Sequence, residues 1–333
     1  MALAVEPSEL TGTGKQSRRR RAREVLPPDP SRRAAVRKRH RNEALAAFGF
    51  LTPWIIGLLV IVIGPMIASL VLSFTRYELI GAPEFVGLDN YERMLTEDPR
   101  WWKSVRVTLL YTGVSVPLVL AFSLALAVFL NRGIRGLALY RTLFYVPSLL
   151  GGSVAIALLW IQVFGSDGLV NAVLGVFGVE SARSWIGNPS TALVTLVALN
   201  VWTFGSSMVI FLAGLRQIPQ SYYEAAALDG ASKWRQFRSI TFPSLSPVIF
   251  FNTLLTIINA LQSFTPAYVI SGGTGAPADS LLLYTVYLYQ RGFTNFQMGY
   301  ASAMAWALLA GLAVITAVLF WSSRFWVFYG EDA

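Results

Sequence analysis

The amino-acid sequence predicts an all-α membrane protein with about six transmembrane helices. Three observations lead to this fold class: six long stretches without a charged residue, a high apolar content, and an uneven distribution of basic residues between the loops. Apolar residues make up 54% of the 333 residues, and the mean hydropathy is +0.53. A soluble protein with six buried core helices is the alternative, but this composition is not typical of one.

Each of the six stretches is long enough for one membrane crossing. A helix needs roughly 20 apolar residues to cross the hydrocarbon, where every backbone group must be satisfied within the segment and a buried charge is costly. The sequence therefore predicts a transmembrane domain over residues 44–325, followed by a short cytoplasmic tail, 326–333. The spans are expected near residues 51–74, 108–130, 143–164, 191–212, 248–270 and 298–320.

The first 43 residues have a different composition. They contain 12 Lys or Arg against 5 acids, with a proline-rich break around Pro27. Such a segment cannot bury an apolar core, so a disordered basic tail is expected over residues 1–43. Retention in the cytoplasm by the positive-inside rule explains its charge without a nucleic-acid partner, and no nucleic acid is expected.

The loops predict which side each terminus occupies. The loops at 131–141 and 213–247 hold more basic than acidic residues, whereas the loops at 76–104 and 165–190 hold more acids. Basic residues accumulate in cytoplasmic loops. We therefore expect a multi-pass protein of the cell membrane, in contact with lipid, with both termini in the cytoplasm.

The composition excludes several kinds of chemistry. The chain has no cysteine and one histidine, His40 in the tail, so thiol catalysis and cysteine metal sites are excluded. The string from Gly12 to Gln16 fails as a phosphate-binding loop, because Gln16 replaces the required Ser or Thr. The predicted spans contain no ionisable residue, which disfavours an ion-coupled carrier, and no catalytic cluster supports a membrane-bound enzyme. No catalytic residue, metal or cofactor is therefore assigned, and a partner must supply the energy.

Uncharged polar residues recur at helical spacing in two predicted spans. Asn252, Thr256, Asn259 and Ser263 would share one stripe of the fifth span, with Gln262 beside it. Asn200 and Trp202 lie in the fourth span. One interpretation is a pathway for a polyhydroxylated solute, in which amides bond hydroxyls and an aromatic ring stacks on a sugar. The other is that these groups join helices to one another.

The segment between the fourth and fifth predicted spans is expected to form two short helices. Ser221 and Glu224 have the spacing of a capping box, which predicts a helix start. Gly230 can end that helix in a left-handed conformation. A second amphipathic stretch begins at Ser232 and leads to Pro243, where the fifth span approaches.

These residues resemble the EAA signature of permease subunits in binding-protein-dependent ABC importers. The signature here begins at Glu224-Ala225-Ala226, continues with Gly230, and ends at Ile240-Thr241-Phe242-Pro243, with Phe242 in place of the usual leucine. Strings beginning at Gly87 (GLDNY), Ile270 (ISGGT) and Tyr300 (YASAMA) are similar to the carbohydrate-uptake group of that family.

The resemblance implies a pore-forming subunit of a sugar importer, which is not itself an enzyme. It implies a second, homologous permease as heterodimer partner, two ATPase subunits and an extracellular sugar-binding protein. An importer for an amino acid, peptide or polyamine is the alternative within the family. The coupling helix that docks on the ATPase would comprise Glu224, Ala225, Ala226, Asp229 and Gly230, with Pro243 beyond it. The solute pathway would use Asn252, Asn259, Gln262, Ser263, Asn200 and Trp202.

Overall fold

The computed structural model describes residues 48–133, 136–179 and 183–328. The predicted basic tail, 1–43, lies outside these residues, as does most of the predicted tail 326–333. Within the described ranges nearly every element is helical, and the strands form one short antiparallel pair. Among the residues that the structure describes, five helices are long and apolar enough to span a membrane, or six if one bent pair counts as a single span. The all-α membrane fold class is confirmed.

Helices of ten or more residues carry most of the structure. They are α2 (Gly64–Ser73), α4 (Pro99–Leu130), α5 (Leu137–Leu150), α6 (Val154–Phe164), α8 (Ala192–Trp202), α9 (Gly205–Gln217), α12 (Phe242–Leu261) and α15 (Met298–Ser323). The shorter elements are β1 (Thr75–Arg76), β2 (Glu84–Phe85), α3 (Asp89–Glu92), α7 (Leu169–Val176), α10 (Gln220–Leu228), α11 (Lys233–Gln236), α13 (Thr265–Ile270) and α14 (Tyr284–Tyr289). The π-helical turns in the described part of the chain are η1 (Leu58–Ile63), η2 (Arg93–Glu97), η3 (Phe237–Thr241) and η4 (Gln290–Thr294).

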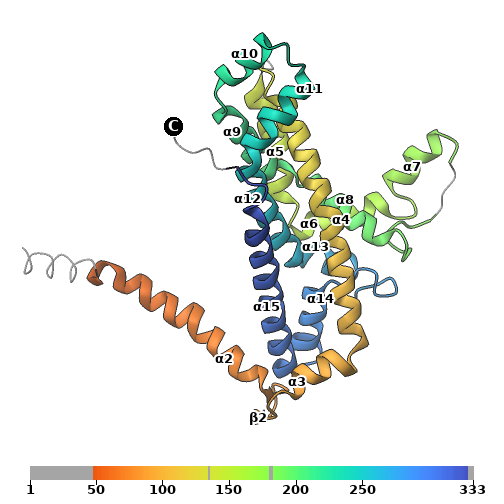
Figure 1. Ribbon diagram of the computed structural model, residues 1–333. Coiled ribbons are helices and arrows are strands. Elements are labelled where there is room, and N and C mark those ends of the chain that lie inside the picture. Colours follow the sequence, from red (N-terminus) through yellow and green to blue (C-terminus); the bar gives the residue numbers. More distant parts are fainter. Residues whose placement is uncertain (1–47, 134–135, 180–182, 329–333) are drawn as a thin grey trace, which may run out of the picture. The chain divides into compact units, whose positions relative to one another are not determined.

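The chain divides between Gly64 and Pro65 into two compact units. The first candidate span, Phe48–Ser73, contains this division. Within the second unit, α4 packs along α9 and α12, and α12 also contacts α15 (Figure 1). These long helices place the α10–α11 segment and the α3–α14 segment at opposite ends of the second unit (Figure 1).

Close packing of α9 against α12 depends on a glycine. A β-carbon at Gly214 would lie 2.9 Å from both Leu245 Cδ1 and Val248 Cγ2. Leu245 is 1% exposed and belongs to an apolar cluster with residues of α4 and α9. A helix face with a small residue lets a neighbouring helix approach closely, so α12 is held firmly against α9.

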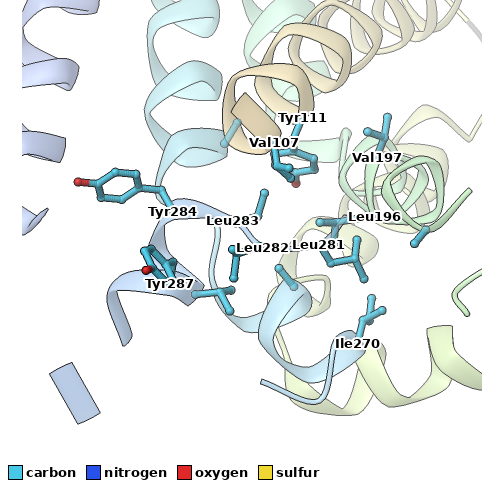
Figure 2. Close-up of a cluster of buried hydrophobic side chains, with 14 of the residues drawn as sticks. Val107, Tyr111, Leu196, Val197, Ile270, Leu281, Leu282, Leu283, Tyr284 and Tyr287 are labelled. Carbon is cyan, nitrogen blue, oxygen red and sulfur yellow. The ribbon is translucent and has the colours of Figure 1, made fainter. Parts of the chain in front are cut away.

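A second apolar cluster surrounds the segment that precedes α14. Leu281, Leu282 and Leu283 are at most 1% exposed. Figure 2 shows them between side chains of α4 and α8, with the hydroxyls of Tyr284 and Tyr287 pointing away from the three leucines. This leucine segment therefore fixes where α14 presents its tyrosines. The surrounding labelled residues are Val107, Tyr111, Leu196, Val197 and Ile270.

The third predicted span, 143–164, is two helices in the structure, because α5 ends at Leu150 and α6 begins at Val154. Ser153 caps α6, and its Oγ accepts a hydrogen bond of 3.3 Å from the Ile156 amide. A β-carbon at Gly151 would lie 2.0 Å from Thr203 Cγ2. The interruption therefore serves close packing against the segment that joins α8 to α9.

The fourth predicted span, 191–212, is likewise bent. Its two halves, α8 and α9, meet at an angle of 43°. Thr203 Oγ1 donates to the Asn200 carbonyl at 2.7 Å, and a β-carbon at Gly205 would lie 2.3 Å from the Phe144 carbonyl oxygen. The bend thus lies at a point where α9 closely approaches the backbone of α5. The fifth predicted span, 248–270, also differs, because α12 begins at Phe242 and the helix is interrupted between Leu261 and Thr265.

The string GLDNY organises the strand pair that follows α2. Gly87 adopts a positive φ of 62°, which suits glycine. Asn90 is 8% exposed and donates from Nδ2 to the carbonyls of Ser73 and Thr75, both at 2.9 Å. Tyr91 donates to Ser73 Oγ at 2.8 Å. These bonds fasten the end of α2 to α3.

Candidate functional site

The α10 helix begins two residues earlier than the predicted capping box requires. Pro219 occupies the N-cap position, and no side chain caps the helix. Proline sets the backbone angle for a helix start, so Ser221 lies inside the first turn and cannot act as the cap. The predicted capping box of Ser221 and Glu224 is therefore wrong, and Glu224 has no capping role.

Gly230 ends α10 as predicted. Its φ is +75°, the left-handed conformation expected at the position after the C-cap, which is Asp229. The Gly230 amide donates to the Ala227 carbonyl at 3.1 Å, and the Ala231 amide donates to the Ala226 carbonyl at 2.9 Å. These two bonds form a Schellman motif, which turns the chain sharply towards α11.

Three side chains hold this turn against the start of α12. Tyr223 of α10 lies 2.9 Å from Thr241 Oγ1, hydroxyl to hydroxyl. Gln236, 4% exposed, donates from Nε2 to the Ala231 carbonyl at 3.2 Å. Ser232 caps α11 through the Arg235 amide. The Tyr223–Thr241 hydrogen bond thus links α10 to η3, which leads directly into α12.

The outer surface of α10 has few partners among the residues that the structure describes. No residue of α10 is buried, and Glu224, Ala225 and Asp229 are exposed. Leu228 is 91% exposed and Trp234 of α11 is 71% exposed. Among the described residues, no ion pair includes Glu224 or Asp229. The segment thus presents two unpaired carboxylates, small residues and isolated apolar side chains. Pro243 lies in the first turn of α12.

The polar stripe of α12 divides into two environments. Asn252 is 1% exposed and donates from Nδ2 to the Ser207 carbonyl of α9 at 3.4 Å, so it joins two helices. Asn259 and Gln262, farther along the helix, are exposed. Ser263 is half-buried, and its carbonyl accepts a hydrogen bond from Thr285 Oγ1. Only Asn259 and Gln262 of this stripe present free amides.

The two predicted pathway residues of α8, Asn200 and Trp202, lie in other environments than the amides of Asn259 and Gln262. Asn200 has a buried Nδ2 without a hydrogen-bond partner among the described residues. Trp202 is half-buried and packs on Trp160 of α6, with ring centroids 5.9 Å apart. Within the described ranges no hydrogen bond links Asn200 to Asn259 or Gln262. The structure therefore does not join the α8 and α12 residues into one polar cluster.

A buried polar network at the N-terminal end of α4 was not predicted from the sequence. Asp98 caps α4 by accepting from the Trp101 amide at 3.1 Å. Its carboxylate also accepts from Tyr287 at 2.6 Å and from Tyr300 at 2.7 Å, and it pairs with Arg291 at 3.1 Å. Asp98 is 6% exposed. The network connects α4, α14, η4 and α15.

The groups around Asp98 keep its carboxylate charged. Burial alone would raise the pKa of Asp98, but the hydrogen bonds from Tyr287 and Tyr300 and the charge of Arg291 outweigh it and lower the pKa below its ordinary value. Burial, followed by the bond to Asp98, raises the pKa of Tyr287 to about 12. The tyrosine therefore remains a donor and the aspartate an acceptor.

One local signal for this network was available in the sequence. Asp98-Pro99 before an apolar run is typical of a helix start. The partner residues, however, lie 189 to 202 positions away along the chain, so no spacing rule connects them. No group of metal-binding side chains occurs within the residues that the structure describes.

Comparison with known protein families identifies the family of this chain. Residues 94–326 match the family described as the binding-protein-dependent transport system inner membrane component. The chain belongs to this family. The predicted resemblance is confirmed, and the protein is a multi-pass membrane subunit of a transport system. Members of this family are permeases, not catalysts.

Similar proteins agree with this assignment. The probable ABC transporter permease protein YesP of Bacillus subtilis is 52% identical over 289 residues, which cover 87% of this chain and 94% of YesP. The lactose transport system permease protein LacF of Rhizobium radiobacter is 33% identical, covering 83% of this chain and 93% of LacF. A solved bacterial alginate ABC transporter, in complex with an alginate pentasaccharide-bound periplasmic protein, shares the fold with a TM-score of 0.74 at 21% identity. That match covers 86% of this chain and 96% of the solved chain.

Proposed function

We propose that this chain is the permease subunit of an ATP-driven sugar importer and forms one half of its translocation pathway. The sugar substrate is supported by the lactose permease LacF among its relatives. The observation that carries the coupling role is the geometry of α10. This exposed helix is ended by Gly230 and fastened to the base of α12 through Tyr223 and Thr241.

The proposed complex contains a second homologous permease, two ATPase subunits and an extracellular sugar-binding protein. ATP binding would close the ATPase dimer and move the docked α10 helices. The Tyr223–Thr241 bond would pass that movement to α12, which also bears Asn259 and Gln262. The coupling residues proposed are Glu224, Ala225, Ala226, Asp229, Gly230 and Pro243.

Sugar uptake by the intact importer tests this function. A strain that lacks the chain should lose uptake of one labelled sugar from a panel of mono- and oligosaccharides, and the wild-type chain should restore it. An unchanged uptake of every sugar, combined with loss of amino-acid, peptide or polyamine uptake, would contradict the sugar assignment while leaving the transporter class intact.

The orientation is a separate prediction. Reporters fused after Ala333 and beside Ser232 should report the cytoplasm, and one beside Gly178 should report the outside. The positive-inside rule gives this expectation, because the 213–247 segment is rich in basic residues. Dual alkaline phosphatase and fluorescent-protein fusions measure it. Termini on opposite sides of the membrane would show an odd number of crossings and exclude the six-span topology.

Asn259 and Asn252 offer a matched pair on one helix. Asn259→Ala should lower transport several-fold while the complex remains assembled, since one lost hydrogen bond to a solute hydroxyl costs roughly 0.5 to 1.5 kcal/mol. Asn252→Ala should instead lower thermal stability, because the buried Asn252 amide bonds the Ser207 carbonyl. Uptake and detergent melting curves separate the two effects. Normal transport by Asn259→Ala would exclude that residue from the solute pathway.

A further inference from the structure

A groove runs beside the membrane-embedded end of α4, close to the α10–α11 segment. Its volume is about 930 Å³. One wall consists of the α4 residues Ala121, Leu124, Ala125 and Val128. Ala121 and Ala125 are exposed in this chain, so the wall is open to an occupant. The lining is thus apolar along the part of α4 that lies within the membrane.

The length of this wall matches one leaflet of a bilayer. From Ala121 to Asn131, which also lines the groove, the helix advances about 15 Å at 1.5 Å per residue. The hydrocarbon core of a bilayer is about 30 Å thick, so its half thickness is about 15 Å. A single acyl chain of one leaflet would therefore fit along α4.

The end of the groove beyond the α4 helix is basic. Arg132 and Lys233 line it, and both are exposed. No acidic residue is among the described residues that line it. Trp234 also lines the groove and packs on Phe237, with centroids 5.6 Å apart. Tryptophan is typical of the membrane–water boundary, and paired basic residues at that depth attract anionic headgroups.

We propose that this groove binds an anionic phospholipid. The acyl chain lies along Ala121, Ala125 and Val128, and the headgroup phosphate is held by Arg132 and Lys233. Charge complementarity selects an anionic lipid over a zwitterionic one, since the phosphate accepts hydrogen bonds from a guanidinium and an ammonium, and no carboxylate is among the described lining residues. Placement in the cytoplasmic leaflet rests on the proposed orientation. The lipid would rest beside α11, the helix that joins the coupling segment to α12.

The purified importer complex, with all its subunits, tests the site. Native mass spectrometry measures retained lipid after exchange into vesicles of equimolar phosphatidylglycerol and phosphatidylcholine. We expect the wild-type complex to retain phosphatidylglycerol preferentially. Arg132→Gln combined with Lys233→Gln should reduce that retention about thirty-fold, given the contribution of each basic residue near a membrane surface. Arg238→Gln, whose residue does not line the groove, is the matched control and should retain the lipid.

A second measurement keeps the test decisive if the double variant assembles poorly. A photoreactive residue at position 125 should cross-link to phosphatidylglycerol in the wild-type background. A protein adduct there would show that a helix of the second permease occupies the groove, and would overturn the proposal. Equal retention of both lipids, or unchanged retention in the double variant, would overturn it as well. Sugar uptake is not a readout here, so a failure of the proposed function stays distinguishable.

Discussion

Asp98→Ala is expected to destabilise the folded permease by about 3 kcal/mol. Removal of one partner of a buried ion pair leaves the other charge uncompensated, which costs roughly 3 to 5 kcal/mol. The lower end applies because the Arg291 side chain is 18% exposed and keeps some contact with solvent. The substitution also removes the acceptor of the Tyr287 and Tyr300 hydroxyls and the cap of α4.

Denaturant or thermal unfolding of the purified protein in detergent measures this effect. Asp279→Asn is the matched control, because Asp279 pairs with Arg100 at 2.7 Å in an exposed setting, with side chains 30% and 45% exposed. Exposed pairs contribute about 0 to 1 kcal/mol, so the control should change little. An Asp98→Ala protein as stable as this control would show that the buried network does not hold α4, α14 and α15 together.

The same network makes the stability of the folded protein depend on pH, in a direction that follows from the pKa of Asp98. The folded pKa of Asp98 is lowered, so the stabilisation from its charge is fully present above the ordinary aspartate pKa of about 3.9. It is lost as the pH falls through the lowered value in the folded state. The difference in stability between wild type and Asp98→Ala should therefore be constant near neutral pH and shrink below about pH 4.

Local signals in the sequence were sufficient for some features of the fold and the site. Gly230 was predicted to end a helix in a left-handed conformation, because only glycine adopts it without strain, and the structure confirms this. The membrane class followed from charge-free stretches, which reflect the cost of a charge in hydrocarbon. Both arguments need only neighbouring residues.

Features that depend on distant residues could not be predicted in this way. The interruption at Gly151 and the bend before Gly205 serve contacts with Thr203 and Phe144, which lie in distant parts of the sequence. The predicted capping box failed because Pro219, two residues before Ser221, sets the helix start first. The Asp98 network joins residues nearly two hundred positions apart. Sequence spacing carries no information about such pairs.

Glu224→Gln is expected to uncouple the importer while leaving the permease folded. In the structure Glu224 is exposed, belongs to no ion pair within the described chain, and does not cap α10. Its charge is therefore free for a basic residue of the proposed ATPase. Truncation of a partly buried interfacial charge pair costs about 2 kcal/mol or more, which corresponds to on the order of thirty-fold weaker docking.

The reconstituted complex with its binding protein provides the measurement. Sugar-stimulated ATP hydrolysis and sugar uptake should fall together in Glu224→Gln, while the amount of permease in the membrane stays at the wild-type level. Ser221→Ala is the matched control on the same helix. A capping role would make that control costly by about 1 kcal/mol, but Ser221 lies inside the helix and makes no cap, so it should behave as wild type. Full coupling in Glu224→Gln would mean that α10 docks through its alanines and Leu228, without a contribution from the carboxylate.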